Sequence, residues 1–176
     1  MTDDTAAINR AISDGGRFGP GSRVTSTTTP AVVYFPAGTY LISTSIIDYY
    51  FTQLIGNPNS LPVLKATPGF VGLGLIDGDQ YQSDGAQGWG STNVFFRQIR
   101  NLKLDLTSIP ASSAATGIHW PTAQATSIQN VVIAMSSAAG TQHQGIFIEN
   151  GMLPPRTGIK RSSSLTSMCR FRRIHE

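Results

Sequence analysis

The hexapeptide Ile99–Leu104 (IRNLKL) recurs as Ile128–Ile133 (IQNVVI), and a step of the same length leads back to Phe70–Leu75 (FVGLGL). In each copy apolar residues occupy the first, fourth and sixth positions, so the final part of each copy alternates as a β-strand does. The third position holds Gly or Asn, the residues that best tolerate a left-handed backbone at a bend. Each copy therefore predicts one bend and one strand of a repeating unit.

A second register supports the repeat, because Gly117–Trp120 (GIHW) is followed by Gly145–Ile148 (GIFI) at almost the same spacing. Repeats of this length, with one bend and strand each, are typical of coils stacked into a solenoid. We therefore expect an all-β, parallel β-helix, a partial solenoid in which Asn101 and Asn130 stack at equivalent corners and join neighbouring coils through their amides. The alternative is an antiparallel sandwich. It requires hairpin turns, and the nearest candidate, at residues 77–78, precedes a polar segment.

The start of the chain predicts one helix and two strands. Asp3-Asp4-Thr5 can cap and favour the N-terminus of a helix over residues 4–14. Ile8, Ala11 and Ile12 share one face of this helix, and we expect it to cap the N-terminal end of the solenoid. Residues 31–35 form a predicted buried strand, and residues 39–43 a strand that returns after a tight turn.

The composition of the 176 residues limits the function classes. The single cysteine, Cys169, excludes an internal disulfide framework and any multi-cysteine metal site. No apolar run approaches the roughly 20 residues of a membrane span, so we expect no membrane partner. Residues 152–176 carry six basic and one acidic side chain, whereas the rest of the chain carries seven basic and nine acidic ones. The body of the protein is therefore mildly acidic, and we expect no nucleic-acid partner.

Several long runs resemble a known family. The start Asp3–Ile8, together with Val33–Tyr40, is similar to the beginning of pectate-lyase-like right-handed β-helices. The runs Gly117–Ser127 and Gly140–Gly151 are similar to those of fungal exo-β-1,3-glucanases of glycoside hydrolase family 55. This resemblance extends from residue 2 to residue 151. It implies right-handed winding, inverting hydrolysis of β-1,3-glucan from the chain end, no cofactor, and a second β-helical half that is absent here.

The resemblance ends at Gly151. We expect residues 1–151 to form a partial pectate-lyase-like β-helix domain, and residues 152–176 to form a basic, aperiodic tail that is disordered or read out of frame. The acidic, polar start of the chain is unlike a secretory signal, so we expect no signal peptide here, although full-length members of the family are extracellular. The resemblance thus implies a truncated N-terminal fragment of a glucanase.

The carboxylates of the chain do not match an inverting glycosidase. Such an enzyme needs an acid and a base whose carboxyl groups lie roughly 6.5–9.5 Å apart. Residues 106–148, the expected groove strands, contain no Asp or Glu, and Glu149 is expected to face solvent or a turn at a strand end. The resemblance implies that the acid comes from the C-terminal half of the family. We therefore expect the fragment to be inactive or nearly so alone.

Uncharged polar side chains are the better site candidates. Gln142, His143 and Gln144 precede a predicted strand, and we expect them to lie beside the coil that carries Gln124 and His119. Glutamine amides can hold a water or bind sugar hydroxyls through paired donor and acceptor atoms. The resemblance implies that Gln144 positions the attacking water, and we expect Gln142, His143 and Gln124 to bind substrate. For Gln124, an amide ladder inside the solenoid is the alternative.

Two tryptophans are candidates for stacking on sugar rings. Trp89 lies between two glycines after a polar loop, residues 77–87, so we expect it to be exposed and to bind substrate. Trp120 instead fits the core side of a strand.

Calcium binding by Asp77, Asp79 and Asp84 is a weaker hypothesis, because their spacing matches no complete calcium loop and turn formation explains them. His119 and His143 lack a third ligand at suitable spacing, so we expect no metal.

Two other function classes stay open. A residual β-helix could bind polysaccharide without catalysis. A pectin-type lyase or hydrolase could use the same fold, but a lyase requires a basic groove residue with calcium-binding carboxylates, and a polygalacturonase requires clustered aspartates. Neither set appears in the expected groove strands.

Overall fold

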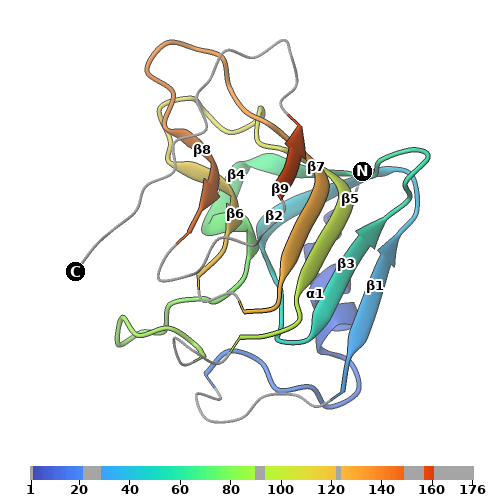
Figure 1. Cartoon of the computed structure of the whole chain (residues 1–176). Helices are drawn as coiled ribbons and strands as arrows, with labels where there is room; N and C mark the ends of the chain where they lie inside the picture. Colours follow the sequence, from blue (N-terminus) through green and yellow to red (C-terminus); the bar gives the residue numbers. More distant parts are fainter. Residues whose placement is uncertain (1, 22–28, 90–93, 122–123, 149–156, 161–176) are drawn as a thin grey trace.

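The computed structural model describes residues 2–21, 29–89, 94–121, 124–148 and 157–160. One helix and nine strands follow one another along these residues (Figure 1). They are α1 (Thr5–Ser13), β1 (Ala31–Phe35), β2 (Thr39–Ile47), β3 (Thr52–Gly56), β4 (Val63–Asp77), β5 (Gln98–Asp105), β6 (Ala115–His119), β7 (Ser127–Ala134), β8 (His143–Phe147) and β9 (Thr157–Lys160).

All pairings between these strands are parallel, and they stack on three faces as the chain winds. The first face stacks β1, β3, β5, β7 and β9. The second face stacks the N-terminal ends of β2 and β4 with the C-terminal ends of β5 and β7. The third face stacks the C-terminal ends of β2 and β4 with β6 and β8. The described strands therefore form a parallel solenoid, and the antiparallel sandwich is wrong.

The predicted asparagine corner is confirmed. Asn101 and Asn130 have left-handed backbones, with φ of 58° and 50°, and the Nδ2 of Asn130 donates to the Oδ1 of Asn101 at 2.9 Å. Before Asn101, β5 pairs with β3; after it, β5 pairs with β4. The corner thus passes the chain from the first face to the second, and the short amide side chain tolerates the left-handed backbone there.

The predicted repeat is right for its later copies and wrong for its first. Ile99 pairs with Ile128, and Ile118 pairs with Ile146, which confirms both predicted spacings. On its other side, however, Ile99 pairs with Leu54 and not with Phe70. The long connection over residues 78–97 lies within this coil, so a constant spacing cannot extend through it. The apolar pattern of Phe70–Leu75 matches the repeat without sharing its register.

The two N-terminal acids have different tasks. Asp3 precedes the N-cap residue Asp4, and its Oδ1 accepts a hydrogen bond from the backbone N–H of Thr5, the first residue of α1, at 3.0 Å. The Oδ2 of Asp4 instead accepts from the backbone N–H of Leu41 in β2, also at 3.0 Å. Asp3 therefore satisfies one free amide at the start of the helix, and the N-cap residue Asp4 ties that start to the first coil, without a capping bond from its side chain.

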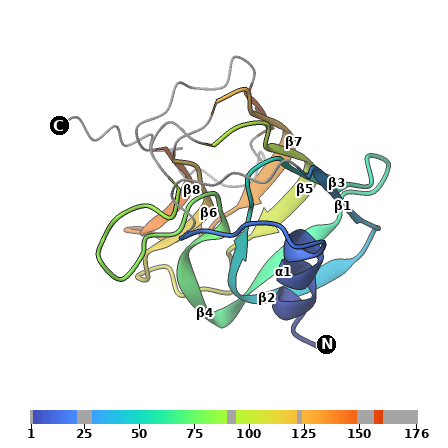
Figure 2. The ribbon, with the colours of Figure 1, turned by 90° about the horizontal axis from the view of Figure 1, so that it is seen from below.

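The helix packs on the first coil through a narrower apolar face than predicted. Ile8 and Ile12 are buried in the core, whereas Ala11 is exposed. Figure 2 shows α1 alongside β2. The strands predicted at 31–35 and 39–43 both form, but the predicted burial of residues 31–35 is wrong, because Val32 and Tyr34 are 63% and 54% exposed. β1 pairs with β3 and β2 with β4, so the turn between them is a corner of the coil and not a hairpin.

Within residues 152–176, the structure describes Thr157–Lys160 only. This strand, β9, pairs in parallel with β7, and Thr157 opposite Ile128 continues the spacing that separates Ile128 from Ile99. Part of the predicted tail therefore extends the first face, and the remainder of that segment lies outside the described residues. Over the described part of the chain, no helix has the length and apolar character needed to cross a membrane.

Candidate functional site

The structure places the predicted glutamines at the start of β8. His143 opens the strand opposite Ala115 of β6, and Gln144 lies opposite Thr116. Gln144 is half-buried and Gln142 is exposed. The backbone N–H of Gln142 donates to the carbonyl of Ala111 at 2.8 Å, which fixes the chain before the strand. The amide of Gln144 is thus carried on a strand that pairs with β6 on one side, at the edge of the described sheet.

His143 holds two loops together beside these glutamines. Its side chain is buried, its Nδ1 accepts from the backbone N–H of Ser136 at 3.1 Å, and its Nε2 lies 3.2 Å from the carbonyl oxygen of Pro110. The backbone donor at Nδ1 requires the tautomer in which Nε2 carries the proton, and that proton faces the carbonyl. Both ring nitrogens are therefore engaged with backbone, and His143 positions the start of β8.

Gln124 lies at a different place in the solenoid. It follows the C-terminal end of β6, whereas Gln142 and Gln144 lie at the N-terminal end of β8, so the length of β6 separates the two sets. Gln124 is exposed and forms an isolated parallel bridge with Phe95 of the preceding coil. The structure therefore does not bring Gln124 together with Gln144, because the third face lies between them.

Trp89 is buried, contrary to the predicted exposure. Its side chain is 0% exposed and meets the ring of Tyr49 edge-on at 6.0 Å. The backbone N–H of Trp89 donates to the Oδ1 of Asp79 at 3.0 Å, and this bond folds the polar loop inward over the core. Trp120 is also buried, as expected, beneath the guanidinium of Arg97 at 4.3 Å from its ring. Glu149 lies outside the described residues.

A buried carboxylate–imidazole pair lies on the third face and was not predicted. The Nδ1 of His119 lies 2.8 Å from the Oδ1 of Asp77, and both side chains are at most 5% exposed. The imidazole stacks between the rings of Tyr81, at 5.7 Å, and Phe147, at 5.5 Å. The carboxylate therefore sets the tautomer of His119, and the rings set its orientation.

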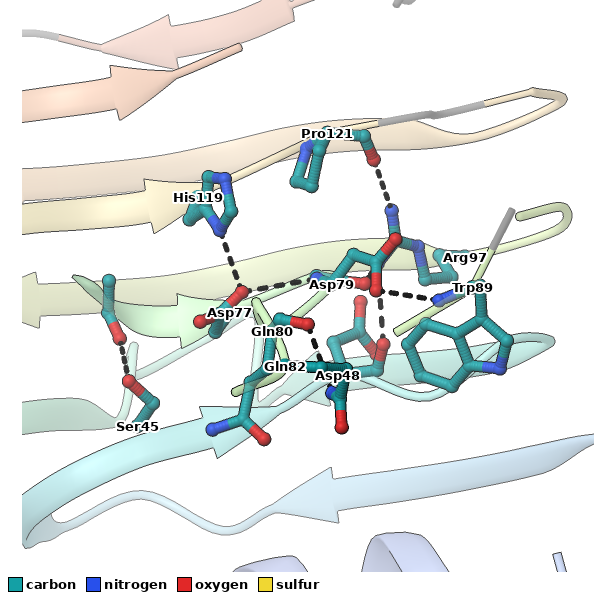
Figure 3. A network of polar contacts seen from close by, with 12 residues as sticks. Ser45, Asp48, Asp77, Asp79, Gln80, Gln82, Trp89, Arg97, His119 and Pro121 are labelled. Atoms are coloured by element: carbon teal, nitrogen blue, oxygen red, sulfur yellow. Dashed lines mark hydrogen bonds and ion pairs between the residues drawn. The ribbon is translucent and has the colours of Figure 1, made fainter. Parts of the chain in front are cut away.

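Arg97 is the centre of a larger buried network (Figure 3). Its guanidinium is 0% exposed and donates to the carbonyls of Gly78, Asp48 and Pro121, the last two at 3.3 and 3.2 Å. Burial raises the pKa of Asp48 to about 7 against the opposing attraction of Arg97 and Arg17. This network ties the polar loop to the coils before and after it.

The network contains a second carboxyl with a raised pKa. Burial raises the pKa of Asp79 to about 6, although the backbone N–H of Trp89 and the charge of Arg97 act in the other direction. Groups that hold a proton near neutral pH can serve as general acids when they reach a substrate. Asp48 and Asp79 are both 0% exposed, so they cannot contact a glycan.

Asp77 is the member of this network that reaches an open cleft. A cleft of about 420 Å³ lies over β2 and β4 and is lined by Asp77, Ser45, Gln80 and Tyr81 among others.

In the described part of the chain, no three His, Cys, Asp or Glu side chains gather closely enough to hold a metal ion. Instead, Asp77 and Asp84 accept hydrogen bonds from the backbone N–H groups of Asp79 and Ala86, at 3.1 and 3.0 Å, as turn-forming aspartates do.

The pair formed by Asp77 and His119 has one sequence signal, which is that each residue follows an isoleucine of the same ladder. Ile76, Ile118 and Ile146 occupy one ladder of the third face, and Asp77, His119 and Phe147 follow them in the next rung. The step from Asp77 to His119 is longer than the step from His119 to Phe147, so spacing alone did not align the pair.

The comparison with known proteins agrees with this architecture. Residues 1–154 match the family model described as "Rhamnogalacturonase A/epimerase, pectate lyase-like". The chain belongs to this pectate-lyase-like family.

Several relatives of this pectate-lyase-like chain carry names. It is 57% identical over 152 residues to a "Glucan 1,3-beta-glucosidase" of Cochliobolus carbonum, covering 86% of this chain and 19% of the relative. It is 51% identical to a "Probable glucan endo-1,3-beta-glucosidase" of Arthroderma benhamiae, covering 85% of the chain and 17% of the relative. It is 49% identical to a "Non-secreted LysM effector LysM15" of Penicillium expansum, covering 86% of the chain and 11% of the relative.

The first two names confirm the resemblance to fungal β-1,3-glucanases. The pectate-lyase-like chain spans less than a fifth of the length of each of these three relatives.

Proposed function

We propose that this chain forms part of the glycan-binding surface of an inverting exo-β-1,3-glucan hydrolase. The observation that carries the proposal is the 57% identity to a protein named glucan 1,3-beta-glucosidase over 86% of the chain. A parallel solenoid with polar side chains on rigid strands supports it, because such faces present regularly spaced groups to a polysaccharide. Right-handed winding, a capping role for α1, a domain boundary near residue 151 and an extracellular setting belong to the same proposal.

In this proposal Gln144 positions the attacking water and Gln142 binds glucan hydroxyls. His143 contributes by fixing the start of β8, since both of its ring nitrogens already contact backbone. Gln124 contacts glycan at a separate place on the solenoid. Trp89, which is fully buried, does not take part in direct binding.

We further propose that the chain binds β-1,3-glucan without hydrolysing it. Hydrolysis with inversion requires an acid and a base on opposite sides of the bond. Residues 106–148 supply no carboxylate, and the two carboxyls with raised pKa, Asp48 and Asp79, are sealed in the core. A pectin-type reaction has no better support, because a cluster of three acidic or histidine ligands is absent from the described residues.

The test separates binding from turnover. Calorimetry with laminari-oligosaccharides should show binding by the 176-residue chain, while glucose release from laminarin stays at background. Gln142→Ala should weaken binding roughly two- to tenfold, the value of one or two lost hydrogen bonds. Gln129→Ala, which changes an exposed glutamine on the first face, is the matched control and should have no effect.

Binding that Gln142→Ala leaves unchanged would contradict the role of Gln142. Tighter binding of polygalacturonate than of laminarin would contradict the proposed substrate class. Glucose release at rates typical of complete glucanases would contradict the proposed inactivity.

A further inference from the structure

The start of the first face carries a row of unusual corner residues. Phe51, Phe96 and Ala125 have left-handed backbones, with φ of 55°, 59° and 50°. The N–H of Phe51 donates to the carbonyl of Phe95 at 3.1 Å, and the N–H of Phe96 donates to the carbonyl of Gln124 at 3.2 Å. Three successive coils therefore stack the dipeptides 50–51, 95–96 and 124–125. We call this row the aromatic corner.

The left-handed backbone is unfavourable for all three of these residues, and most of all for the two phenylalanines. Glycine and asparagine adopt it readily, as Asn101 and Asn130 do at the other end of the same face, but a bulky phenylalanine is strained in it. Such strain persists where surrounding contacts enforce it, and it is concentrated at functional sites. At Phe51 the buried Arg17 supplies such contacts, because its Nη2 donates to the carbonyls of Tyr50 and Phe51 at 2.6 and 3.2 Å. At Phe96 the bond from its N–H to the carbonyl of Gln124 and the ring of Phe51 supply them.

The strained backbone directs one aromatic ring toward solvent. The ring of Phe96 packs against those of Phe51 and Phe95, with centroids 5.2 and 5.8 Å apart, and it is still 47% exposed. A single exposed phenylalanine is ordinary by itself, but a corner optimised for stability alone would hold Gly or Asn at this backbone conformation. The ring of Phe96 is thus both firmly supported and open.

We infer that Phe96 is a sugar-stacking residue that binds the apolar face of one glucosyl unit of a β-glucan, with Gln124 binding its hydroxyls. Flat apolar surfaces flanked by a few polar groups are the usual composition of a small-molecule site. The exposed Gln124 lies one coil beyond Phe95 in the same row. The choice of glucan rests on the proposed function, while the stacking itself suits any glycan with an equatorial, apolar ring face.

The decisive variant is Phe96→Gly, since glycine removes the ring and also relieves the left-handed backbone. We expect the melting temperature to stay the same or rise, and the Kd for laminari-oligosaccharides, measured by calorimetry, to increase about tenfold. Phe96→Trp, which keeps an aromatic face, should retain binding. Tyr34→Ala is the matched control, because Tyr34 of β1 is 54% exposed and lies outside the aromatic corner; it should leave binding unchanged.

A folded Phe96→Gly protein that binds as tightly as the original chain would overturn the inference. If Phe96→Gly does not fold, Phe96→Leu keeps the apolar bulk without an aromatic face, and unchanged binding by that variant would also overturn it. Cello-oligosaccharides separate this inference from the proposed function. If laminari-oligosaccharides do not bind but cello-oligosaccharides bind in a manner that depends on Phe96, the proposed substrate fails and the stacking site stands. If neither glycan binds the original chain, both fail.

Discussion

The two coils formed by residues 98–148 differ sharply from the coil that precedes them. The later coils keep an almost constant step on the first and third faces, and apolar ladders such as Ile99–Ile128 fill their interior. The preceding step is much longer on both faces, because it contains the long connection over residues 78–97, which we call the insertion. Asp48, Asp79 and Arg97 are buried in this irregular coil. Repeated apolar ladders therefore stabilise the regular coils, whereas hydrogen bonds from the buried Arg97 tie the irregular coil together. The three predictions that follow exploit this difference.

The largest effect is expected from Arg97→Met in the irregular coil. The change removes the donor to three carbonyls and leaves buried carboxylates without their counter-charge, so the free energy of unfolding should fall by about 3–5 kcal/mol. Urea unfolding followed by circular dichroism measures it. Arg100→Met is the matched control and should cost about 0–1 kcal/mol, because the one side-chain hydrogen bond of Arg100 among the described residues is a 3.5 Å contact with Gln53. Equal losses would show that the network does not stabilise the insertion.

The buried acids should also make the irregular coil sensitive to pH. The pKa of Asp48 rises to about 7 and that of Asp79 to about 6 on folding, from 3.8. Between about pH 4 and 7 the folded state therefore binds more protons than the unfolded state. Stability should then fall as pH rises, by at most about 1.4 kcal/mol per pH unit for each group.

Denaturant titrations from pH 5 to pH 8 test this, and Asp48→Asn should flatten the slope. The range avoids Asp3, whose pKa of about 2 reflects hydrogen bonds from Ser43 and Thr5 and whose stabilising contribution is lost only at lower pH. A rise in stability from pH 5 to pH 8 would contradict the burial of proton-binding carboxyls.

The smallest effect is expected at the asparagine corner of the regular coils. Asn130→Ala removes an amide hydrogen bond worth about 1 kcal/mol and places alanine in a left-handed backbone at a further cost of about 1–2 kcal/mol. Asn130→Gly removes only the hydrogen bond and should be the milder change. Melting temperatures of the two variants provide the comparison. A glycine variant as unstable as the alanine variant would mean that backbone conformation is not what Asn130 supplies.

The regular coils could be predicted from sequence because their signal is local and repeated. Each regular step carries an apolar ladder and an Asn at the corner, so the strand pairing and the bond between Asn101 and Asn130 follow from spacing alone. The same reasoning gave wrong predictions around the insertion, because its length breaks the constant spacing. The insertion displaced the register that Phe70–Leu75 was expected to share, and it turned the polar loop inward so that Trp89 is buried.

The candidate site was predicted unevenly for the same reason. Gln144 lies at the start of a strand opposite the preceding coil, as expected, because that strand belongs to the regular part. The insertion lies between Asp77 and His119 in the sequence, so the regular spacing did not predict that they pair. The left-handed backbone of Phe96 is held by its N–H bond to the carbonyl of Gln124 in the next coil, and its ring packs on Phe51 of the preceding coil. Both partners are remote in sequence, so no local pattern reveals them. The roles of the glutamines in glycan binding stay predictions.

The parallel pairing has a consequence for how the chain acquires its structure. On the first face each strand pairs with the next strand but one along the chain, as β1 does with β3 and β3 with β5, so no strand finds its partner through a local hairpin. Non-local pairing of this kind makes folding slow compared with that of helical proteins. The entropic cost of closing a loop grows only with the logarithm of its length, so lengthening a loop by half adds only about 0.4 kcal/mol. Corners of the solenoid are therefore places where evolution can insert residues with little loss of stability, and a growing chain can close one coil before the next has been synthesised.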